Sequence, residues 1–87
     1  MDVIVGPQAK KYLRKLPKTF QIIIAEKLKK LGKKNGGRSE KLGGYKDIYR
    51  VRVGNYRIVY KQFKNRIYIV LIGHRKEVYN LLRNLLK

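Results

Sequence analysis

Apolar and polar residues alternate strictly along the stretch YRVRVGNYRIVYK, residues 49–61. Such alternation on both sides of a Gly-Asn pair predicts a β-hairpin with its turn at Gly54 and Asn55. In this register Arg52 lies opposite Arg57, and directly paired residues share one face of the sheet. One face of the hairpin is then apolar, with Tyr49, Val51, Val53, Tyr56, Ile58 and Tyr60, while the other carries Arg50, Arg52 and Arg57.

Apolar residues at helical spacing predict three helices in the rest of the chain. A short β-rich run, residues 3–5, comes first. Pro7 suits the first turn of a helix, which Pro17 ends, and a second helix continues to Gly32 or close to it. The first helix has Ala9, Tyr12, Leu13 and Leu16 on its apolar side, and the second has Phe20, Ile23, Ile24, Leu28 and Leu31. A C-terminal amphipathic helix aligns Val78, Leu81, Leu82, Leu85 and Leu86.

A third strand, RIYIVLIG at residues 66–73, is expected to pair with the second hairpin strand across Lys64 and Asn65. This register places Ile67, Ile69 and Leu71 on the core face, and it adds Val59, Lys61, Phe63, Tyr68, Val70 and Ile72 to the arginine face. The glycine-rich segment KKNGGRSEKLGG, residues 33–44, predicts a basic loop.

These elements predict one α+β domain over residues 1–87. Its order is an N-terminal strand, a two-helix hairpin, a three-stranded antiparallel meander and a short C-terminal helix. We expect the first two helices to cover the apolar face of the sheet and to leave the arginine face open and concave.

The chain is strongly basic, because 23 lysines and arginines oppose 5 acidic residues and give a net charge of +18. Such an excess repels itself in the folded state and indicates a polyanionic partner. A membrane partner is disfavoured because the longest apolar run, IYIVLIG, has the length of a strand. Nucleic acid is therefore the favoured partner. Without cysteine or an N-terminal signal segment, the chain is expected to be cytoplasmic.

Arginines on an open sheet face suit metal-free cleavage of RNA, in which the ribose 2′-hydroxyl attacks the adjacent phosphorus. This reaction needs charge stabilisation on the phosphate, a base for the 2′ proton and an acid for the leaving oxygen. Arginine meets the first need because its planar fork matches phosphate oxygens and stays charged. No metal or cofactor is expected, since the acidic residues fall on separate elements without ligand spacing: Asp2, Glu26, Glu40, Asp47 and Glu77.

The groups able to carry protons lie in the segment GHRKEVY, residues 73–79. His74 and Tyr79 are the candidates, and Arg75 follows the third strand closely enough to reach the arginine face. Arg57, Arg75 and Tyr79 are therefore the candidate catalytic residues. The candidate RNA-binding residues are Arg50, Arg52, Lys61 and His74.

The segments LPKTF, YRVRVGNYRIVY and GHRKEVY resemble the RelE/ParE toxin superfamily of toxin–antitoxin systems, and the order of elements is similar over essentially the whole chain. For the RelE branch, the resemblance implies a microbial-RNase-type sheet and a ribosome-dependent endoribonuclease, an mRNA interferase that inhibits translation. It also implies a RelB-like antitoxin as a partner, besides messenger RNA and ribosomal RNA. The basic residues and the tail tyrosine of that branch correspond to Arg50, Arg52, Arg57, Arg75 and Tyr79.

Well-studied members of the RelE branch have lysines where this chain has Arg50 and Arg52, and one of those lysines is a proposed general base. Arginine barely deprotonates, so that role passes to Tyr79 or His74. Two other functions stay open. ParE-like members resemble this fold but poison DNA gyrase without cutting RNA, and a non-catalytic RNA-binding protein would use the same arginines.

Overall fold

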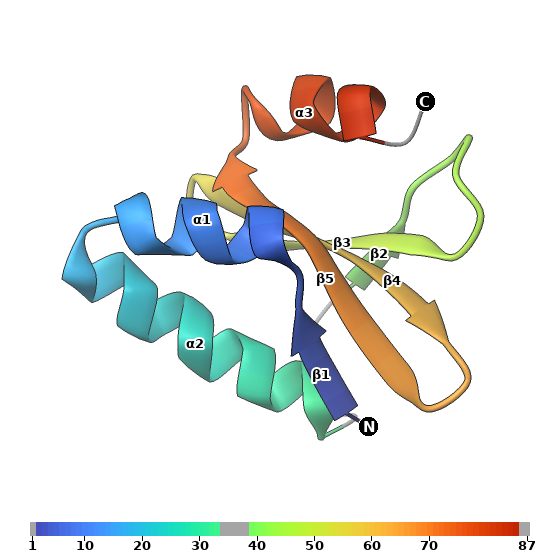
Figure 1. The fold of residues 1–87 in the computed structure, drawn as a ribbon, viewed down its shortest axis with the longest axis horizontal. Helices are drawn as coiled ribbons and strands as arrows, with labels where there is room; N and C mark the ends of the chain where they lie inside the picture. The colour runs from blue at the N-terminus through green and yellow to red at the C-terminus, as the bar shows by residue number, and fades with distance from the viewer. Residues whose placement is uncertain (1, 34–38, 86–87) are drawn as a thin grey trace.

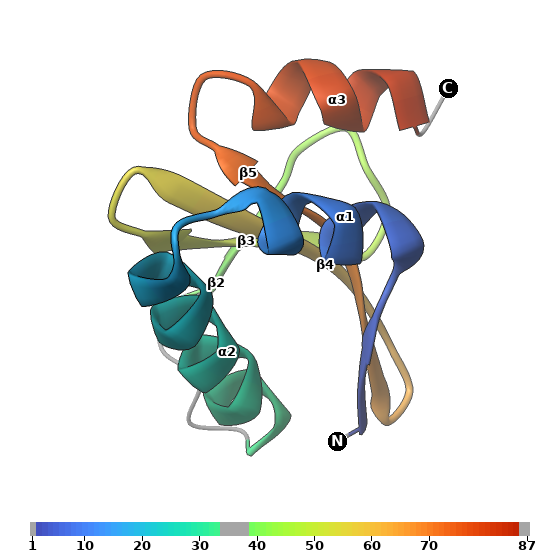
Figure 2. The ribbon, with the colours of Figure 1, turned by 60° about the vertical axis from the view of Figure 1, so that its left-hand side comes forward.

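The computed structural model describes residues 2–33 and 39–85. In chain order, its elements are β1 (Asp2–Val5), α1 (Pro7–Lys15), α2 (Lys18–Gly32), β2 (Ser39–Lys41), β3 (Ile48–Val53), β4 (Tyr56–Phe63), β5 (Arg66–His74) and α3 (Val78–Leu85). Figures 1 and 2 show α1 and α2 on one side of the sheet and α3 across the end of β5. The predicted α+β fold is confirmed. None of the described helices is long and apolar enough to cross a membrane.

The described strands form one sheet in the order β1-β5-β4-β3-β2. β1 runs parallel to β5, and the other neighbouring strands are antiparallel. The register of β3 and β4 is the predicted one, with Val53 opposite Tyr56 and Arg52 opposite Arg57. Gly54 enters the turn with a φ of +58°, a conformation that a residue without a Cβ atom adopts at little cost.

The pairing of β4 with β5 contains a β-bulge. Tyr60 lies opposite Ile69 as predicted, but Val59 lies opposite Leu71, so Val70 is an extra residue in β5. One extra residue reverses the alternation of side chains beyond it. The prediction was therefore wrong for Leu71, which lies on the arginine side, and for Ile72, which lies in the core between the sheet and the helices.

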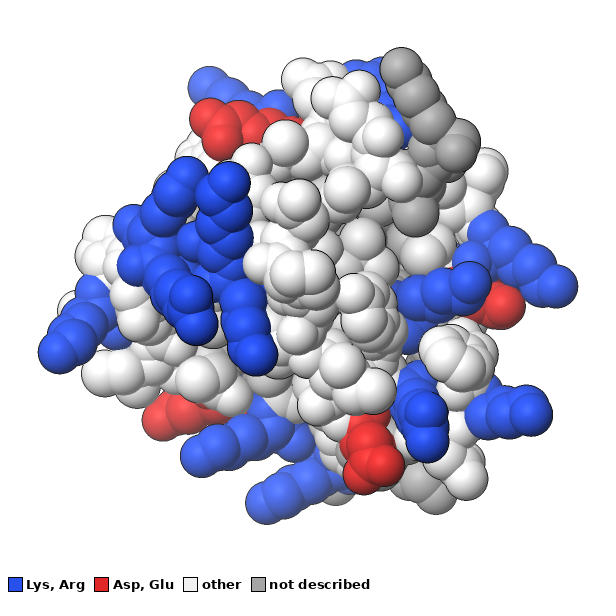
Figure 3. Space-filling model, in the orientation of Figure 1, with Lys and Arg blue, Asp and Glu red and all other residues white. Residues whose placement is uncertain are grey.

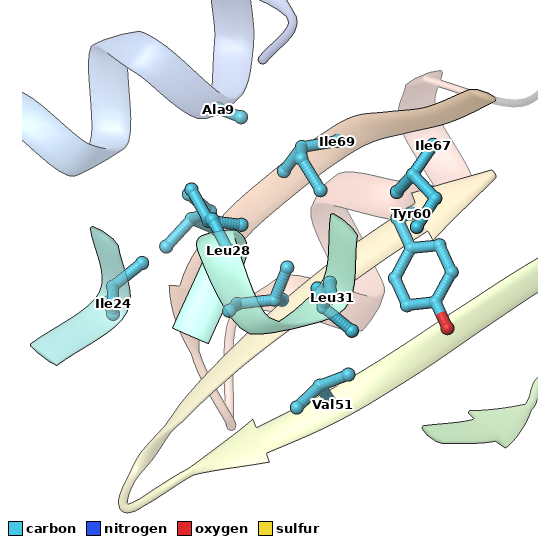
Figure 4. Close-up of a cluster of buried hydrophobic side chains, with 10 residues drawn as sticks. Ala9, Ile24, Leu28, Leu31, Val51, Tyr60, Ile67 and Ile69 are labelled. Atoms are coloured by element: carbon cyan, nitrogen blue, oxygen red, sulfur yellow. The ribbon is translucent and has the colours of Figure 1, made fainter. Parts of the chain in front are cut away.

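The main core fills the space between α1, α2 and one face of the sheet, and Figure 4 shows these side chains converging. Its buried members are Ala9, Ile24, Leu28, Leu31, Val51, Ile58, Tyr60, Ile67, Ile69 and Ile72. Full burial of one such aliphatic side chain contributes about 1.5–3 kcal/mol. The apolar face of the predicted hairpin is confirmed as a core face.

A second, smaller cluster lies on the other face of the sheet, beneath α3. Its buried members are Ile48, Val59, Leu71, Val78 and Leu82. The arginine face is therefore not open along its whole length, contrary to the prediction. Because α3 is amphipathic and short, it buries its apolar side against this face, and the arginines keep the part near the β3–β4 turn.

Three further expectations need correction or limits. Part of the predicted loop forms β2, which pairs with β3, because an edge strand offers unpaired backbone groups to a neighbouring segment.

On α2, Phe20 and Ile23 are 37% and 43% exposed although they share the apolar stripe with the buried residues. The Phe20 ring packs instead against Tyr56, with 4.9 Å between ring centres. Residues 34–38 of the predicted loop and Leu86 lie outside the described residues.

Docking of α3 should depend on Leu82 rather than on Leu85. Leu82 is 1% exposed inside the second cluster, whereas Leu85 is 43% exposed. We expect Leu82→Ala to lower the free energy of unfolding by about 2–5 kcal/mol, because it leaves a cavity, and Leu85→Ala by less than about 0.5 kcal/mol. Urea denaturation of the two variants measures this difference. Equal effects would contradict the described position of α3.

Candidate active site

Arg50 joins three elements of the structure. It lies on β3, and its side chain is 20% exposed. Its Nη1 atom donates a hydrogen bond to the Tyr79 hydroxyl on α3, and its Nη2 atom donates to Glu40 Oε2 on β2 at 2.5 Å. The Arg50 Cζ atom also lies 5.7 Å from the centre of the Tyr79 ring. The fold thus brings together Arg50 and Tyr79, two predicted site residues that are 29 positions apart.

Glu40 is a member of this cluster that was not expected from the sequence. Its carboxylate is 54% exposed, accepts the hydrogen bond from Arg50 and lies 4.0 Å from Arg52 Nη2. The hydrogen bond and the charge of Arg50 lower the pKa of Glu40 below its ordinary 4.5, so the side chain is ionised at neutral pH. A signal for Glu40 was present, since it is the only acidic residue in the basic stretch 27–46.

A buried tyrosine holds β2 in register. Tyr60 is 4% exposed in the main core, and its hydroxyl donates a 2.7 Å hydrogen bond to Ser39 Oγ. Burial raises the pKa of the Tyr60 phenol, so the hydroxyl stays protonated as a donor. Because a shift of one residue would turn Glu40 to the opposite face, this contact helps to keep Glu40 opposite Arg50.

The other predicted arginines gather at the β3–β4 turn. Arg52 is 61% exposed and lies directly opposite Arg57. The Arg57 Nη1 atom donates to the carbonyl oxygens of Gly54 and Tyr56, each at 2.9 Å, which fixes its guanidinium beside the turn. Arg75 is exposed, and its backbone N–H donates to Asn55 O at 2.8 Å, so it lies at the same end of the sheet.

Lys61 and His74 are not brought into this cluster. Lys61 is exposed on the arginine side, but the buried Val59 lies between it and Arg57 along β4. His74 lies opposite Tyr56 because of the bulge, and its ring meets the Tyr56 ring edge-on, with 6.1 Å between ring centres. Its Nδ1 atom accepts a 3.3 Å hydrogen bond from the backbone N–H of Lys76.

A hollow of about 400 Å³ opens beside the cluster, lined by Lys27, Glu40, Arg50 and Arg52. Three cations and one carboxylate give this hollow a positive net charge, which suits a phosphate group. The Nε atom of Arg50 is buried and has no hydrogen-bond partner among the described residues. Within residues 2–33 and 39–85, no group of three or more His, Cys, Asp or Glu side chains could hold a metal ion.

The arrangement of these elements has counterparts among known proteins. A family model described as the ParE toxin of the type II toxin–antitoxin system, parDE, matches residues 3–79. The chain belongs to this toxin family. The predicted resemblance to the RelE/ParE superfamily is thereby confirmed.

Solved structures of other toxins share the fold of this toxin. The isolated RelE toxin of E. coli is 25% identical over 99% of this chain and 98% of its own, with a TM-score of 0.72. The toxin in the intact E. coli RelBE toxin–antitoxin complex is 26% identical over 84% and 94%, with a TM-score of 0.71. The YoeB dimer of Staphylococcus aureus is 28% identical over 85% and 95%, with a TM-score of 0.67. No curated protein matches the chain.

The pKa of Glu40 in this toxin should depend more on Arg50 than on Arg52. Because the folded-state pKa is lowered, the Glu40–Arg50 pair stabilises the fold above pH 4.5, and this contribution is lost as the pH falls through the lowered pKa. We expect Arg50→Met to return the Glu40 pKa toward 4.5 and Arg52→Met to raise it less, since Arg50 is the nearer cation. Titration of the Glu40 carboxyl carbon by NMR measures both. A larger rise in Arg52→Met would contradict the described geometry.

Proposed function

We propose that this toxin is a ribosome-dependent endoribonuclease that cleaves messenger RNA without a metal ion and so inhibits translation. The observation that carries the proposal is that Arg50 contacts both Tyr79 and Glu40, and that Glu40, Arg50 and Arg52 line a positively charged hollow. This cluster contains a phosphate-binding fork, a phenol and a carboxylate, which are the groups that 2′-hydroxyl attack requires. The dependence on the ribosome rests on the resemblance to the RelE branch.

Glu40 takes the role of general base in this proposal. The sequence left that role to Tyr79 or His74, but Glu40 is the only carboxylate in contact with the arginine cluster among the described residues. It is ionised at neutral pH and more than half exposed, so it can accept a proton from a bound ribose. Arg50 donates to both groups, but an ionised carboxylate accepts a proton more readily than a neutral phenol.

The reaction proceeds by exchange of one P–O bond for another. Glu40 removes the 2′-hydroxyl proton as the 2′ oxygen bonds to phosphorus, and the bond from phosphorus to the 5′ oxygen breaks. Tyr79 donates its phenolic proton to that leaving oxygen, which is consistent with Arg50 donating to the Tyr79 oxygen and leaving the O–H free. The products are a 2′,3′-cyclic phosphate and a 5′-hydroxyl.

In this proposal the arginines have two roles, to stabilise charge on the phosphate and to position the RNA backbone. Arg57 and Arg75, at the end of the sheet beside the β3–β4 turn, stabilise the charge that develops on the phosphate oxygens. Arg50 and Arg52 position the RNA backbone next to Glu40. Exposed Lys61 contacts RNA farther along the same face of the sheet. His74, whose ring packs against Tyr56, would contact RNA only at the edge of the site.

Cleavage of a defined message on purified ribosomes, mapped by primer extension, tests this function. We expect Glu40→Gln and Arg57→Ala each to lower the cleavage rate about 100-fold or more, because one loses the base and the other a preorganised donor. Tyr79→Phe should slow cleavage with little change in KM. Asp2→Asn on β1, at the opposite edge of the sheet from β2, removes the same charge as Glu40→Gln and should cleave normally.

The matching family model, that of a ParE toxin, favours one second candidate, poisoning of DNA gyrase. In that case messages stay intact on the ribosome while gyrase accumulates in covalent adducts with DNA. An inactive wild-type toxin beside an active control nuclease would therefore exclude the ribonuclease, and gyrase–DNA adducts would then separate a gyrase poison from a non-catalytic RNA-binding protein. Normal cleavage by Glu40→Gln would exclude Glu40 as the base but not the nuclease.

A RelB-like antitoxin is the proposed protein partner, and it would act in the cytoplasm with the toxin. The solved relatives include RelE with RelB from E. coli and YoeB with YefM from Staphylococcus aureus. The charge of +18 favours an acidic or amphipathic antitoxin segment that covers the arginine face or displaces α3.

Arg57→Ala should then weaken binding of the cognate antitoxin roughly 10-fold or more and make it less sensitive to salt. The matched variant is Arg66→Ala, which removes an exposed arginine at the far end of β5 and should bind normally. Isothermal titration at two salt concentrations measures both. Identical affinity of Arg57→Ala and wild type would rule out an antitoxin that covers the arginine face.

A further inference from the structure

Four of the six exposed residues of α1 are cations. The helix buries Ala9 and half-buries Tyr12 and Leu13, while Lys10, Lys11, Arg14 and Lys15 are exposed. No acidic residue occurs in α1. Figure 3 shows basic side chains gathered over this part of the surface, at the left of the view. We call these four side chains the α1 cationic face.

The α1 cationic face is unfavourable for the stability of the helix itself. Lys10 lies one turn from Arg14, and Lys11 lies one turn from Lys15, and each such like-charge pair costs about 0.2–0.5 kcal/mol. The ion pairs among the described residues join Glu40 to Arg50 and Arg52, so no carboxylate neutralises this face. Such a concentration of unpaired charge indicates an anionic ligand.

The chemistry of the face favours phosphate over a protein partner. Protein interfaces are depleted in lysine and depend on buried aromatic or apolar anchors. The exposed large apolar side chains of the described chain lie on other elements: Ile4, Phe20, Ile22, Ile23, Phe63 and Leu85. An acidic protein segment would therefore find charge on α1 but no large exposed apolar side chain.

The face also favours a double helix over a single strand. Single-stranded sites stack bases on exposed aromatic rings, whereas duplex RNA is recognised mainly through its phosphates and 2′-hydroxyls. The aromatic residue of α1, Tyr12, is half-buried against the second cluster, and the Lys15 ammonium lies 5.8 Å from its ring centre. This ring is not available as a stacking platform.

We propose that the α1 cationic face binds the phosphate backbone of double-helical RNA. α1 packs on the helix side of the sheet, where Ala9 joins the main core, whereas Arg50 and Tyr79 lie on the other side with α3. An RNA strand in the candidate active site is therefore a different segment from the duplex on α1. The inference goes beyond the proposed cleavage, because duplex binding can be measured whether or not the toxin cleaves RNA.

Fluorescence anisotropy with a short labelled RNA hairpin of mixed sequence, titrated with the toxin over a series of salt concentrations, tests the proposal. The test variant carries Lys11→Gln, Arg14→Gln and Lys15→Gln together. If three phosphate contacts are lost, the slope of log affinity against log salt should fall by about 2 to 3 and the affinity at low salt by about 10-fold or more. Because like-charge pairs are relieved, the variant should unfold at the same or a higher temperature than wild type.

A matched variant removes the same charge from scattered positions, with Lys29→Gln, Lys46→Gln and Lys64→Gln. It should lower the salt slope by less than about 1. An equal fall in both variants would overturn the proposal, because net charge alone would then explain binding. Unchanged hairpin binding by the α1 variant, with weaker binding of the cognate antitoxin, would overturn it in favour of an acidic protein.

Failure of this proposal and failure of the proposed function give different results. If both hold, the α1 variant should cleave ribosome-bound messages with a higher KM and an unchanged kcat, since the α1 cationic face contributes no side chain to the candidate active site. If the toxin does not cleave RNA at all, the hairpin titration still shows whether α1 binds duplex RNA. A loss of kcat in the α1 variant would contradict a purely docking role.

Discussion

The extra residue Val70 in β5 is the constraint on which both layers of this molecule depend. It decides which residue faces which core: Leu71 packs beneath α3 and Ile72 beneath the other helices, the reverse of what regular alternation from Ile69 would give. The bulge also places Gly73 opposite Arg57, and a Cβ atom at Gly73 would lie 3.9 Å from the Val78 side chain at the start of α3. The start of α3, and with it the position of Tyr79, therefore follows from the register of β5.

The site depends on a second feature, the short edge strand β2. This strand is attached by its ladder to β3, by the Tyr60–Ser39 hydrogen bond and by the Arg50–Glu40 ion pair. All three attachments act on β2, residues Ser39–Lys41. Because Tyr60 belongs to the main core and bonds to Ser39, the position of Glu40 depends on that core. In the proposed function, a phosphate in the hollow would compete with Glu40 for Arg50 and so release the carboxylate from its ion pair.

The charge of +18 places a general limit on this toxin. A domain of this size has a stability of only a few kcal/mol, and self-repulsion lowers it further. Any anionic partner that binds the folded state alone adds stability by mass action. Neutralisation by the proposed RNA or by the proposed acidic antitoxin would therefore be both a recognition event and a source of stability for the same fold.

The sequence by itself determined the elements and the hairpin. Alternation around Gly54 and Asn55 is a local property, and it predicted the register of β3 and β4 and the three arginines that β3 and β4 carry. Spacing of apolar residues likewise predicted the helices, because one side of each must be buried. These patterns repeat within a few residues, so they can be seen without knowing what packs against them.

Only the tertiary structure decided the bulge and the part of the sheet that α3 covers. It also decided that Glu40 belongs to the candidate active site and that His74 does not. Val70 looks like any other strand residue, and the alternation of RIYIVLIG gives no sign of an extra position. Glu40 meets Arg50 only because β2 pairs with the edge of β3, and His74 leaves the arginine side only because the bulge turns it toward Tyr56. Such contacts join residues far apart in the chain, and their energies depend on neighbours that no local pattern contains.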